Sequence, residues 1–351
     1  MNYRFYGQFA ARGVLEPLEP YVEDSSEFEL DEFYPQAVDA FRWNGEVTCL
    51  PQNISSLVVY FNRDLFERFG VEPPRNAMQW VELVEKAQLM TRDANGVPVR
   101  GADPDVPQTG TAPAAIYGLG VEPTIIRLAP FVWSNGGEIV DDEEAPTRFT
   151  LDTPEARDVL QNFFGLRAGL GVVPTDQEVE SEDDETRFVN GRLAMLLSSR
   201  RSVPTFREAA EFDWDIVSLP VFDEPAGILH SDAYCMTKAS DAKDAAWRFV
   251  EFALGPEGAP VVAETGRTVP SLKSVAQSDA FLDPSEKPAN SRVFLDGIEN
   301  IRRVPTISTW PEIEDVSEGI LENGMHLAQP VDEVIAELDR KTRPLFERAE
   351  R

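Results

Sequence analysis

The chain has 351 residues, 42% of them hydrophobic, and its 62 acidic and 32 basic side chains give a formal net charge of −30. This length is enough for two domains of ordinary size, each with a sizeable core. The negative charge argues against nucleic acid and anionic lipid as partners, and the sequence contains no run of about 18 apolar residues that would span a membrane.

The N-terminal region predicts short helices and a hairpin. Met1–Phe5 has no charged start, apolar centre or cleavage site, so it does not read as a signal peptide. We expect an aromatic-rich helix within residues 2–21 and a second helical piece within 33–41. The next segment carries Asn44-Gly45, a strong two-residue turn signal, which predicts a hairpin.

Residues 50–66 predict a loop, a buried strand and a helix in succession. The loop begins with a proline and small polar residues, the strand is an apolar β-branched run, and the helix ends at Gly70. A strand that fixes an unpaired polar loop is suited to present amides and hydroxyls at a cleft, so Gln52, Asn53 and Ser55 are candidate ligand contacts. The alternative is an ordinary solvated turn.

The same stretch resembles a known family. Residues 51–66, followed by Gly70-Val71-Glu72-Pro73-Pro74 and Trp80-Val81-Glu82-Leu83, are similar to the extracellular solute-binding proteins of ABC transporters, in the group that includes maltose-type sugar binders. Arg63 stands where lysine is more common in that family. Further along, Arg187–Leu197 matches its pattern of Phe, a small residue, Gly, a basic residue and Ala-Met before a strand.

The resemblance implies the type II periplasmic-binding-protein fold, in which two α/β lobes are joined by hinge crossings. The alternation of strands with helices of about 10 to 15 residues also predicts α/β lobes. We place lobe one in residues 1–113, lobe two in 114–228, the return of lobe one in 229–303 and the closing helices of lobe two in 304–351. The resemblance further implies that an export signal and the first strand, helix and strand of lobe one precede Met1.

Local patterns predict several later elements. Trp80 begins an apolar repeat at helical spacing, so we expect it in the core. Residues 91–114 are rich in proline and glycine and predict a loop. Thr153 followed by Pro154 predicts a helix start, and residues 214–220 predict an edge strand. The acidic run 178–185 lacks the glycine and alternating ligands of a calcium loop, so we interpret it as a solvated surface.

Cys49 and Cys235 are the two cysteines of the chain. Two cysteines cannot form a disulfide framework or a Cys-rich metal site. The implied fold places both in lobe one, so a single disulfide and a pair of buried thiols are both open, and we favour the buried thiols.

The candidate ligand contacts lie on the two walls of the implied cleft. A sugar requires aromatic faces for its C–H surface and many groups that hydrogen-bond its hydroxyls. In lobe one we select Asn2, Tyr3, Gln52, Asn53 and Ser55. In lobe two and the crossings we select Arg200, Arg201, His230, Ser231, Asp232 and Trp310. Trp310 matches the aromatic of the family's final segment, which commonly stacks on a sugar ring, and its alternative role is buried packing.

The resemblance implies the substrate-binding component of an ABC importer. Such a monomer would capture a sugar or oligosaccharide between two closing lobes and deliver it to a membrane permease, outside the cytoplasm, with or without a lipid anchor. We expect no catalysis, cofactor or metal. Two alternatives stay open: an organophosphate or other anionic solute, because of Arg200, Arg201 and His230, and a glycoside hydrolase, whose two carboxylates need no fixed spacing.

Overall fold

The computed structural model describes residues 1–99 and 113–350. Its α-helices are α1 Tyr3–Ala11, α2 Glu19–Glu23, α3 Pro35–Asp39, α4 Arg63–Phe69, α5 Trp80–Met90, α6 Ile125–Ser134, α7 Pro154–Ala168, α8 Asp176–Ser181, α9 Asp184–Val189, α10 Val203–Ala209, α11 Lys243–Leu254, α12 Gly258–Glu264, α13 Lys273–Ala276, α14 Asp279–Leu282, α15 Val293–Asp296, α16 Trp310–His326 and α17 Val331–Glu347. The strands are β1 Arg42–Trp43, β2 Glu46–Val47, β3 Cys49–Pro51, β4 Leu57–Asn62, β5 Tyr117–Gly120, β6 Leu193–Ser199, β7 Trp214–Val217, β8 Gly227–Ile228, β9 Ala233–Cys235 and β10 Ile301–Arg302.

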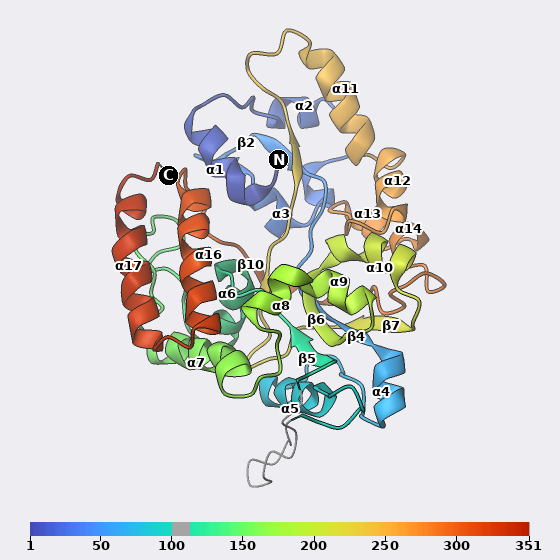
Figure 1. Cartoon of the computed structure of the whole chain (residues 1–351). Coiled ribbons are helices and arrows are strands. Elements are labelled where there is room, and N and C mark those ends of the chain that lie inside the picture. The colour runs from blue at the N-terminus through green and yellow to red at the C-terminus, as the bar shows by residue number, and fades with distance from the viewer. Residues whose placement is uncertain (100–112, 351) are drawn as a thin grey trace.

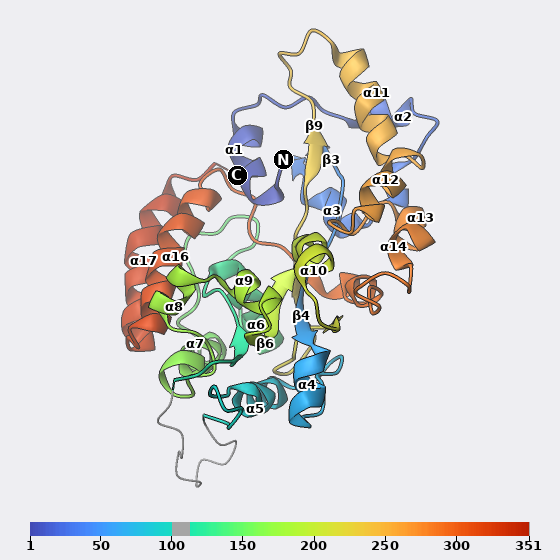
Figure 2. The ribbon, with the colours of Figure 1, turned by 45° about the vertical axis from the view of Figure 1, so that its right-hand side comes forward.

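These elements gather into two regions and a flank. Helices α1, α2, α3 and α11 lie at one end of the molecule around the β3–β9 pair, and the main sheet lies towards the other end with α4 and α5 (Figures 1 and 2). Helices α16 and α17 run side by side along one flank and pack on α7. Their apolar positions, including Ile313, Ile320, Val334 and Leu338, are buried, which confirms the two predicted closing helices.

The main sheet has four strands in the order β5-β6-β4-β7. Strand β4 pairs antiparallel with both β6 and β7, and β5 pairs parallel with β6. All residues of these strands are buried, and the apolar run that predicted β4 is typical of a strand covered on both faces. Strand β7 lies at the edge, as its terminal proline predicts.

The position of β4 corrects a predicted boundary. We assigned residues 1–113 to lobe one, yet β4 (57–62) hydrogen-bonds with β6 and β7, which come from the segment assigned to lobe two. The chain therefore enters this sheet before residue 57, and the boundary after residue 113 is wrong. The cause is that a buried apolar strand carries no local signal of which distant strands it will pair with. Residues 100–112 of the predicted loop 91–114 lie outside the described residues.

The β3–β9 pair carries a covalent link. Cys49 and Cys235 stand directly opposite each other in this antiparallel ladder, with Cα atoms 4.3 Å apart, and they form a disulfide across 186 residues of sequence. The preference for two buried thiols is therefore wrong. Opposed residues of two antiparallel strands hold their Cβ atoms close enough for a bridge, and that opposition arises only when the two strands pair.

Several local predictions are confirmed. Asn44 and Gly45 have φ of 53° and 86°, the left-handed conformations that a two-residue hairpin turn requires between β1 and β2. The Thr153 hydroxyl accepts a hydrogen bond from the Ala156 amide at the start of α7. Trp80 is 5% exposed and stacks between Phe163 and Phe222, so it belongs to the core.

Candidate functional site

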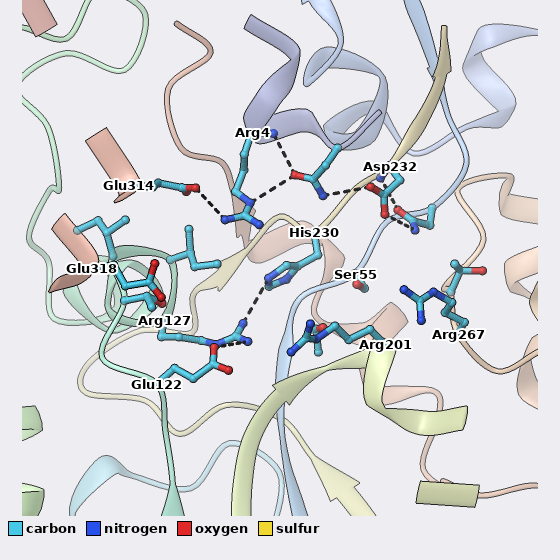
Figure 3. A pocket seen from close by; sticks show the side chains of 17 residues that line it. Arg4, Ser55, Glu122, Arg127, Arg201, His230, Asp232, Arg267, Glu314 and Glu318 are labelled. Carbon is cyan, nitrogen blue, oxygen red and sulfur yellow. Dashed lines mark hydrogen bonds and ion pairs between the residues drawn. The ribbon is translucent and has the colours of Figure 1, made fainter. Parts of the chain in front are cut away.

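A polar cavity of about 570 Å³ lies between the two regions of the molecule (Figure 3). One wall comes from the start of α1, the loop after β3, the segment before β9 and the turn at 267–268; the other comes from the start of α6 and the end of β6, with α16 at the side. The lining residues are Asn2, Arg4, Asn53, Ser55, Glu122, Thr124, Ile125, Ile126, Arg127, Ser199, Arg201, His230, Asp232, Arg267, Thr268, Glu314 and Glu318.

An amide–carboxylate network forms the first wall. Asn2 donates from Nδ2 to Asp232 Oδ1 at 3.1 Å, and Asn53 donates from Nδ2 to Asp232 Oδ2 at 3.4 Å. The Asp232 amide in turn donates to Asn53 Oδ1 at 2.7 Å. Backbone bridges between residues 2 and 232 and between 55 and 230 hold the three segments together. Asp232 is thereby fixed at the cavity with lone pairs left for hydroxyl donors.

Arg127 organises the opposite wall. Its side chain is 5% exposed, its Nη2 atom lies 3.0 Å from Glu122 Oε2, and its Nη1 atom lies 3.5 Å from His230 Nε2. A guanidinium can only donate, so His230 accepts through Nε2 and carries its proton on Nδ1. The Nδ1 atom is buried and has no partner among the described residues. Burial, followed by Arg127, Arg4 and Arg201, holds the pKa of His230 well below its usual 6.5, so the ring is neutral near pH 7.

A third charged pair links α1 to α16. Arg4 donates from Nη1 to Glu314 Oε2 at 2.8 Å, and the indole of Trp310 donates to Glu314 Oε1 at 2.8 Å. Burial is the main reason that the pKa of Glu314 is raised above its usual value, although Arg4 opposes the rise. Trp310 itself is fully buried against Phe149 and Phe346. Trp310 therefore orients the Glu314 carboxylate. We predicted that the Trp310 ring would contact the ligand, but the ring does not line the cavity.

Six of the eleven predicted contacts line the cavity: Asn2, Asn53, Ser55, Arg201, His230 and Asp232. Tyr3, Gln52, Arg200, Ser231 and Trp310 do not. Tyr3 is buried; Gln52 donates to the Tyr234 hydroxyl at 3.0 Å; Ser231 donates to the Asn53 carbonyl at 2.7 Å; and Arg200 is buried, where it donates to the Gly266 carbonyl at 2.7 Å and lies over the Phe281 ring.

In two extended segments, backbone geometry explains which predicted residues line the cavity and which do not. Successive side chains of an extended segment point to opposite sides, so residues 53 and 55 face the cavity while 52 and 54 face away, and residues 230 and 232 face it while 231 does not. The sequence prediction selected whole polar stretches and ignored this alternation. Alternation would have separated Gln52 from Asn53 and Ser55, and Ser231 from His230 and Asp232, and the tertiary structure decides which of the two sets faces the cavity.

The prediction also missed most of the charged lining. Arg4, Glu122, Arg127, Arg267, Glu314 and Glu318 all line the cavity and were not selected. Two of them had a usable signal, because Glu122 and Arg127 flank the turn from the end of β5 into α6, the edge of an α/β sheet where ligands commonly bind. Within the described chain the lining contains no Phe, Tyr or Trp side chain, so the groups that hydrogen-bond a sugar are present without the aromatic faces on which a sugar ring would stack.

Comparison with known proteins decides the family. The sequence model of the family described as bacterial extracellular solute-binding protein matches residues 2–289. The chain belongs to this family. The predicted resemblance to solute-binding proteins is therefore confirmed, over most of the chain.

Solved and curated relatives of this solute-binding protein agree on the fold. An ABC substrate-binding protein of Listeria monocytogenes, solved in complex with cycloalternan, superimposes with a TM-score of 0.85 at 23% identity, covering 98% of this chain and 84% of that one. A Brucella abortus protein named only as a binding protein is 23% identical over 330 residues, 91% of this chain and 72% of its own. The maltotriose-binding protein of Pyrococcus abyssi is 24% identical over 277 residues, 77% of this chain and 53% of its own. The predicted type II periplasmic-binding-protein fold is confirmed.

Across residues 1–99 and 113–350, none of the helices combines the length and apolarity needed to cross a bilayer. Over the same ranges, no group of three or more His, Cys, Asp or Glu side chains is arranged to hold a metal ion.

Proposed function

We propose that this solute-binding protein captures a carbohydrate in the cavity and delivers it to the permease of an ABC importer. The observation that carries the proposal is the preorganised polar lining, in which Asp232, the Arg127–Glu122 pair and the Arg4–Glu314 pair are already held by protein partners. Charged groups held in this way exchange strong hydrogen bonds with hydroxyls without a further cost of ordering. The carbohydrate ligands named for the Listeria and Pyrococcus relatives support this class of ligand.

The balance of charge in the lining favours a neutral sugar over an anionic solute. Among the described residues, four arginines (4, 127, 201 and 267) face four carboxylates (122, 232, 314 and 318). An organophosphate would approach these carboxylates without gaining a net positive site, whereas a neutral polyol exchanges hydrogen bonds with both signs. The anionic alternative therefore ranks second.

Three strand crossings supply a hinge for closure. Ser55 pairs with His230 through backbone hydrogen bonds, the Leu229 amide donates to the Arg302 carbonyl at 2.8 Å, and β8 pairs parallel with β10. These adjacent segments are where the chain passes between the two regions. We propose that small backbone rotations here close the two walls on the ligand, and that the permease recognises the closed form.

We further propose that the bound saccharide is released unchanged, outside the cytoplasm. The Cys49–Cys235 disulfide supports an oxidising compartment. Lipid anchoring is part of the same proposal, and incorporation of labelled fatty acid into the protein in its native host would test it.

The test is a thermal-shift screen against neutral mono-, di- and trisaccharides, with sugar phosphates as the comparison series. At roughly 100 times the dissociation constant a ligand adds about 2.7 kcal/mol to the free energy of unfolding. We expect a shift with one neutral saccharide series, and chromatography of the recovered ligand should show it intact. Hydrolysis of that ligand would contradict the binding role, and a response to sugar phosphates alone would contradict the neutral sugar.

A further inference from the structure

A row of hydrogen-bonded side chains runs along one wall of the main cavity (Figure 3). At one end Asn53 donates to Asp232, which also accepts from Asn2. The row continues through Arg4, whose Nε atom donates to Asn2 Oδ1 at 3.3 Å and whose Nη1 atom donates to Glu314 Oε2 at 2.8 Å. Side chains from the loop after β3, the segment before β9, the start of α1 and α16 are thereby joined in sequence, and all of them line the cavity.

The row keeps hydrogen-bonding capacity that its internal contacts do not use. A carboxylate accepts about four hydrogen bonds, and Asp232 and Glu314 each accept two from the described side chains. A guanidinium carries five donor hydrogens, of which Arg4 uses two in the described chain. The wall therefore offers acceptors at both ends and donors between them. A hydroxyl both donates and accepts, so a line of hydroxyls matches this order.

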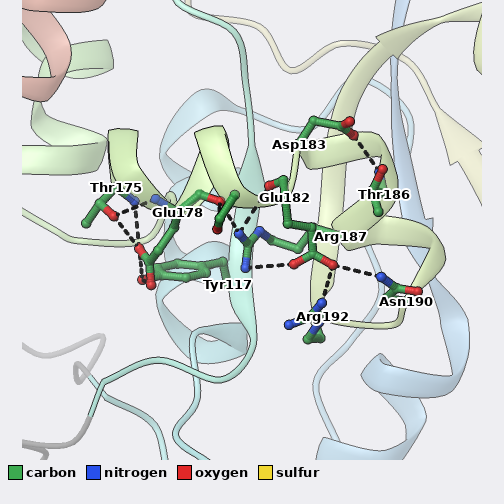
Figure 4. Close-up of polar contacts among 10 residues, drawn as sticks. Tyr117, Thr175, Glu178, Glu182, Asp183, Thr186, Arg187, Asn190 and Arg192 are labelled. Carbon is green, nitrogen blue, oxygen red and sulfur yellow. Dashed lines mark hydrogen bonds and ion pairs between the residues drawn. The ribbon is translucent and has the colours of Figure 1, made fainter.

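A network of polar contacts ties α8 and α9 to β5, a strand that leads into the opposite wall (Figure 4). The Tyr117 hydroxyl of β5 donates to Glu178 Oε2 of α8 at 2.8 Å. Arg187 of α9 donates to the Glu178 carbonyl at 2.9 Å and lies 3.3 Å from the Glu182 carboxylate. Asp183 caps α9. The interpretation of this acidic run as a solvated surface is therefore wrong for these side chains, and the opposite wall is held in place before a ligand binds.

The opposite wall is polar as well. Glu122 and Arg127 pair there, and Thr124 between them has a buried hydroxyl without a hydrogen-bond partner among the described residues. A six-membered sugar ring carries its hydroxyls mainly around its rim and turns two C–H faces outwards, and such faces bind best against aromatic side chains. Between these two walls the C–H faces would meet charged groups, which would lose water without gaining a hydrogen bond.

An open-chain polyol suits both walls. Each of its carbon atoms bears a hydroxyl, and along an extended chain these hydroxyls project to both sides. Hydroxyls on one side can exchange hydrogen bonds with the row from Asp232 to Glu314, and those on the other side with the Arg127–Glu122 pair. No broad C–H face is then pressed against a charged wall.

Resting on the proposed carbohydrate function, we propose that the ligand is an open-chain sugar alcohol that lies along the row from Asp232 to Glu314. The ligand class is set by the absence of a stacking surface in the described lining and by the linear order of acceptors and donors.

Isothermal titration with matched pairs tests the ligand class. Mannitol with mannose, and glucitol with glucose, share their carbon number and differ in whether the chain is closed into a ring. We expect the better sugar alcohol to bind about tenfold more tightly than its ring partner, because it gains hydrogen bonds on both walls. Equal or tighter binding of the ring forms, or of glucose di- and trisaccharides, would overturn the open-chain ligand and leave the carbohydrate function standing.

A chain-length series tests the role of the row. The six-carbon alcohol should bind about tenfold more tightly than four-carbon erythritol, which reaches fewer groups of the row. Arg4→Met removes the connection to Glu314, so this ratio should fall to about one. Arg12→Met is the matched control, because it makes the same exchange at an exposed residue that follows α1 outside the cavity, and it should keep the ratio. A ratio that Arg4→Met leaves unchanged would overturn the assignment of the ligand to this row.

Failure of the carbohydrate function itself gives a different result. If the wild-type protein binds sugar phosphates but neither sugar alcohols nor neutral saccharides, both proposals are contradicted together.

Discussion

The two adjoining cavities differ in how their charges are satisfied. In the main cavity Glu122, Glu314 and Asp232 each have a protein partner, an arginine for the two glutamates and two asparagine amides for the aspartate. In a second cavity of about 420 Å³, which shares Glu122, Arg201 and Glu318 with the main one, Asp184, Glu318 and Glu322 form no ion pair within the described residues. A wall whose charges are already paired is ordered before the ligand arrives, and it discriminates by geometry. In the second cavity Glu318 and Glu322 are exposed to water, so only Asp184, whose pKa burial raises, destabilises the fold when it is ionised.

The largest effect on the main cavity is expected from removing the disulfide that joins β3 and β9. Asn53 and Asp232 follow and precede the strands β3 and β9, which the disulfide joins. Replacing both cysteines with alanine should lower the free energy of unfolding by about 3–5 kcal/mol, because a closed loop of this length restricts the unfolded chain strongly. Urea unfolding measures the loss, and the wild-type protein unfolded in a reducing agent should reproduce it. An unchanged urea midpoint would show that the disulfide does not stabilise the fold.

The next largest effect concerns ligand affinity. Arg127→Met removes the cation that holds Glu122 and contacts His230, so saccharide affinity should fall about 100-fold, equivalent to roughly 2.7 kcal/mol. Stability should change little, because the Glu122 side chain is 54% exposed and water can replace the arginine. Titration calorimetry measures the affinity. Arg157→Met is the control, since Arg157 pairs with Asp332 away from both cavities; an equal loss in that variant would contradict the role of Arg127.

The pH dependence of the free energy of unfolding tests how the buried Asp184 differs from the paired carboxylates of the main cavity. Its pKa is about 7 in the folded protein against 3.8 ordinarily, so above pH 4 the unfolded state releases this proton first and the group destabilises the fold increasingly up to pH 7. Asp184→Asn should therefore match the wild type near pH 4 and exceed its free energy of unfolding by roughly 2 kcal/mol near pH 8. Urea unfolding at both pH values measures the difference. A gap of the same size at both pH values would show that the carboxylate is not the source.

The smallest expected effect lies within the amide–carboxylate network. Asp232→Asn keeps the shape of the side chain but removes the charge that strengthens the hydrogen bonds from Asn2 and Asn53. We expect a loss of about 1 kcal/mol and a melting temperature lower by about 2 °C. Calorimetry measures it beside Asp241→Asn, an exposed control. If the melting temperature of the control falls as much as that of Asp232→Asn, the loss comes from the change in net charge and not from the network of hydrogen bonds.

Local chemistry made much of the chain predictable. The Asn44-Gly45 turn, the Thr153 cap and the buried Trp80 depend on residues within one or two turns of each other, and each was predicted from sequence. The family resemblance extended the prediction to the fold. Within the candidate site, Asn53 and Asp232 were selected because their segments were recognised as polar loops at a cleft.

The errors share one physical origin, because they concern contacts between segments far apart in sequence. The partner strands of β4, the opposition of Cys49 and Cys235, and the burial of Trp310 against Phe346 all depend on which surfaces meet when the chain folds. No residue within a local window carries that information.

The sequence by itself determined the elements, the family and the polar character of the ligand loops, since propensities, caps and turn residues act over a few positions. The tertiary structure alone decided which side of each extended loop faces the cavity, which arginines pair with which carboxylates, and which carboxylates are left unpaired. The reason is that burial sets both the strength of a charge interaction and the cost of leaving a charge alone, and burial exists only after distant segments have packed together.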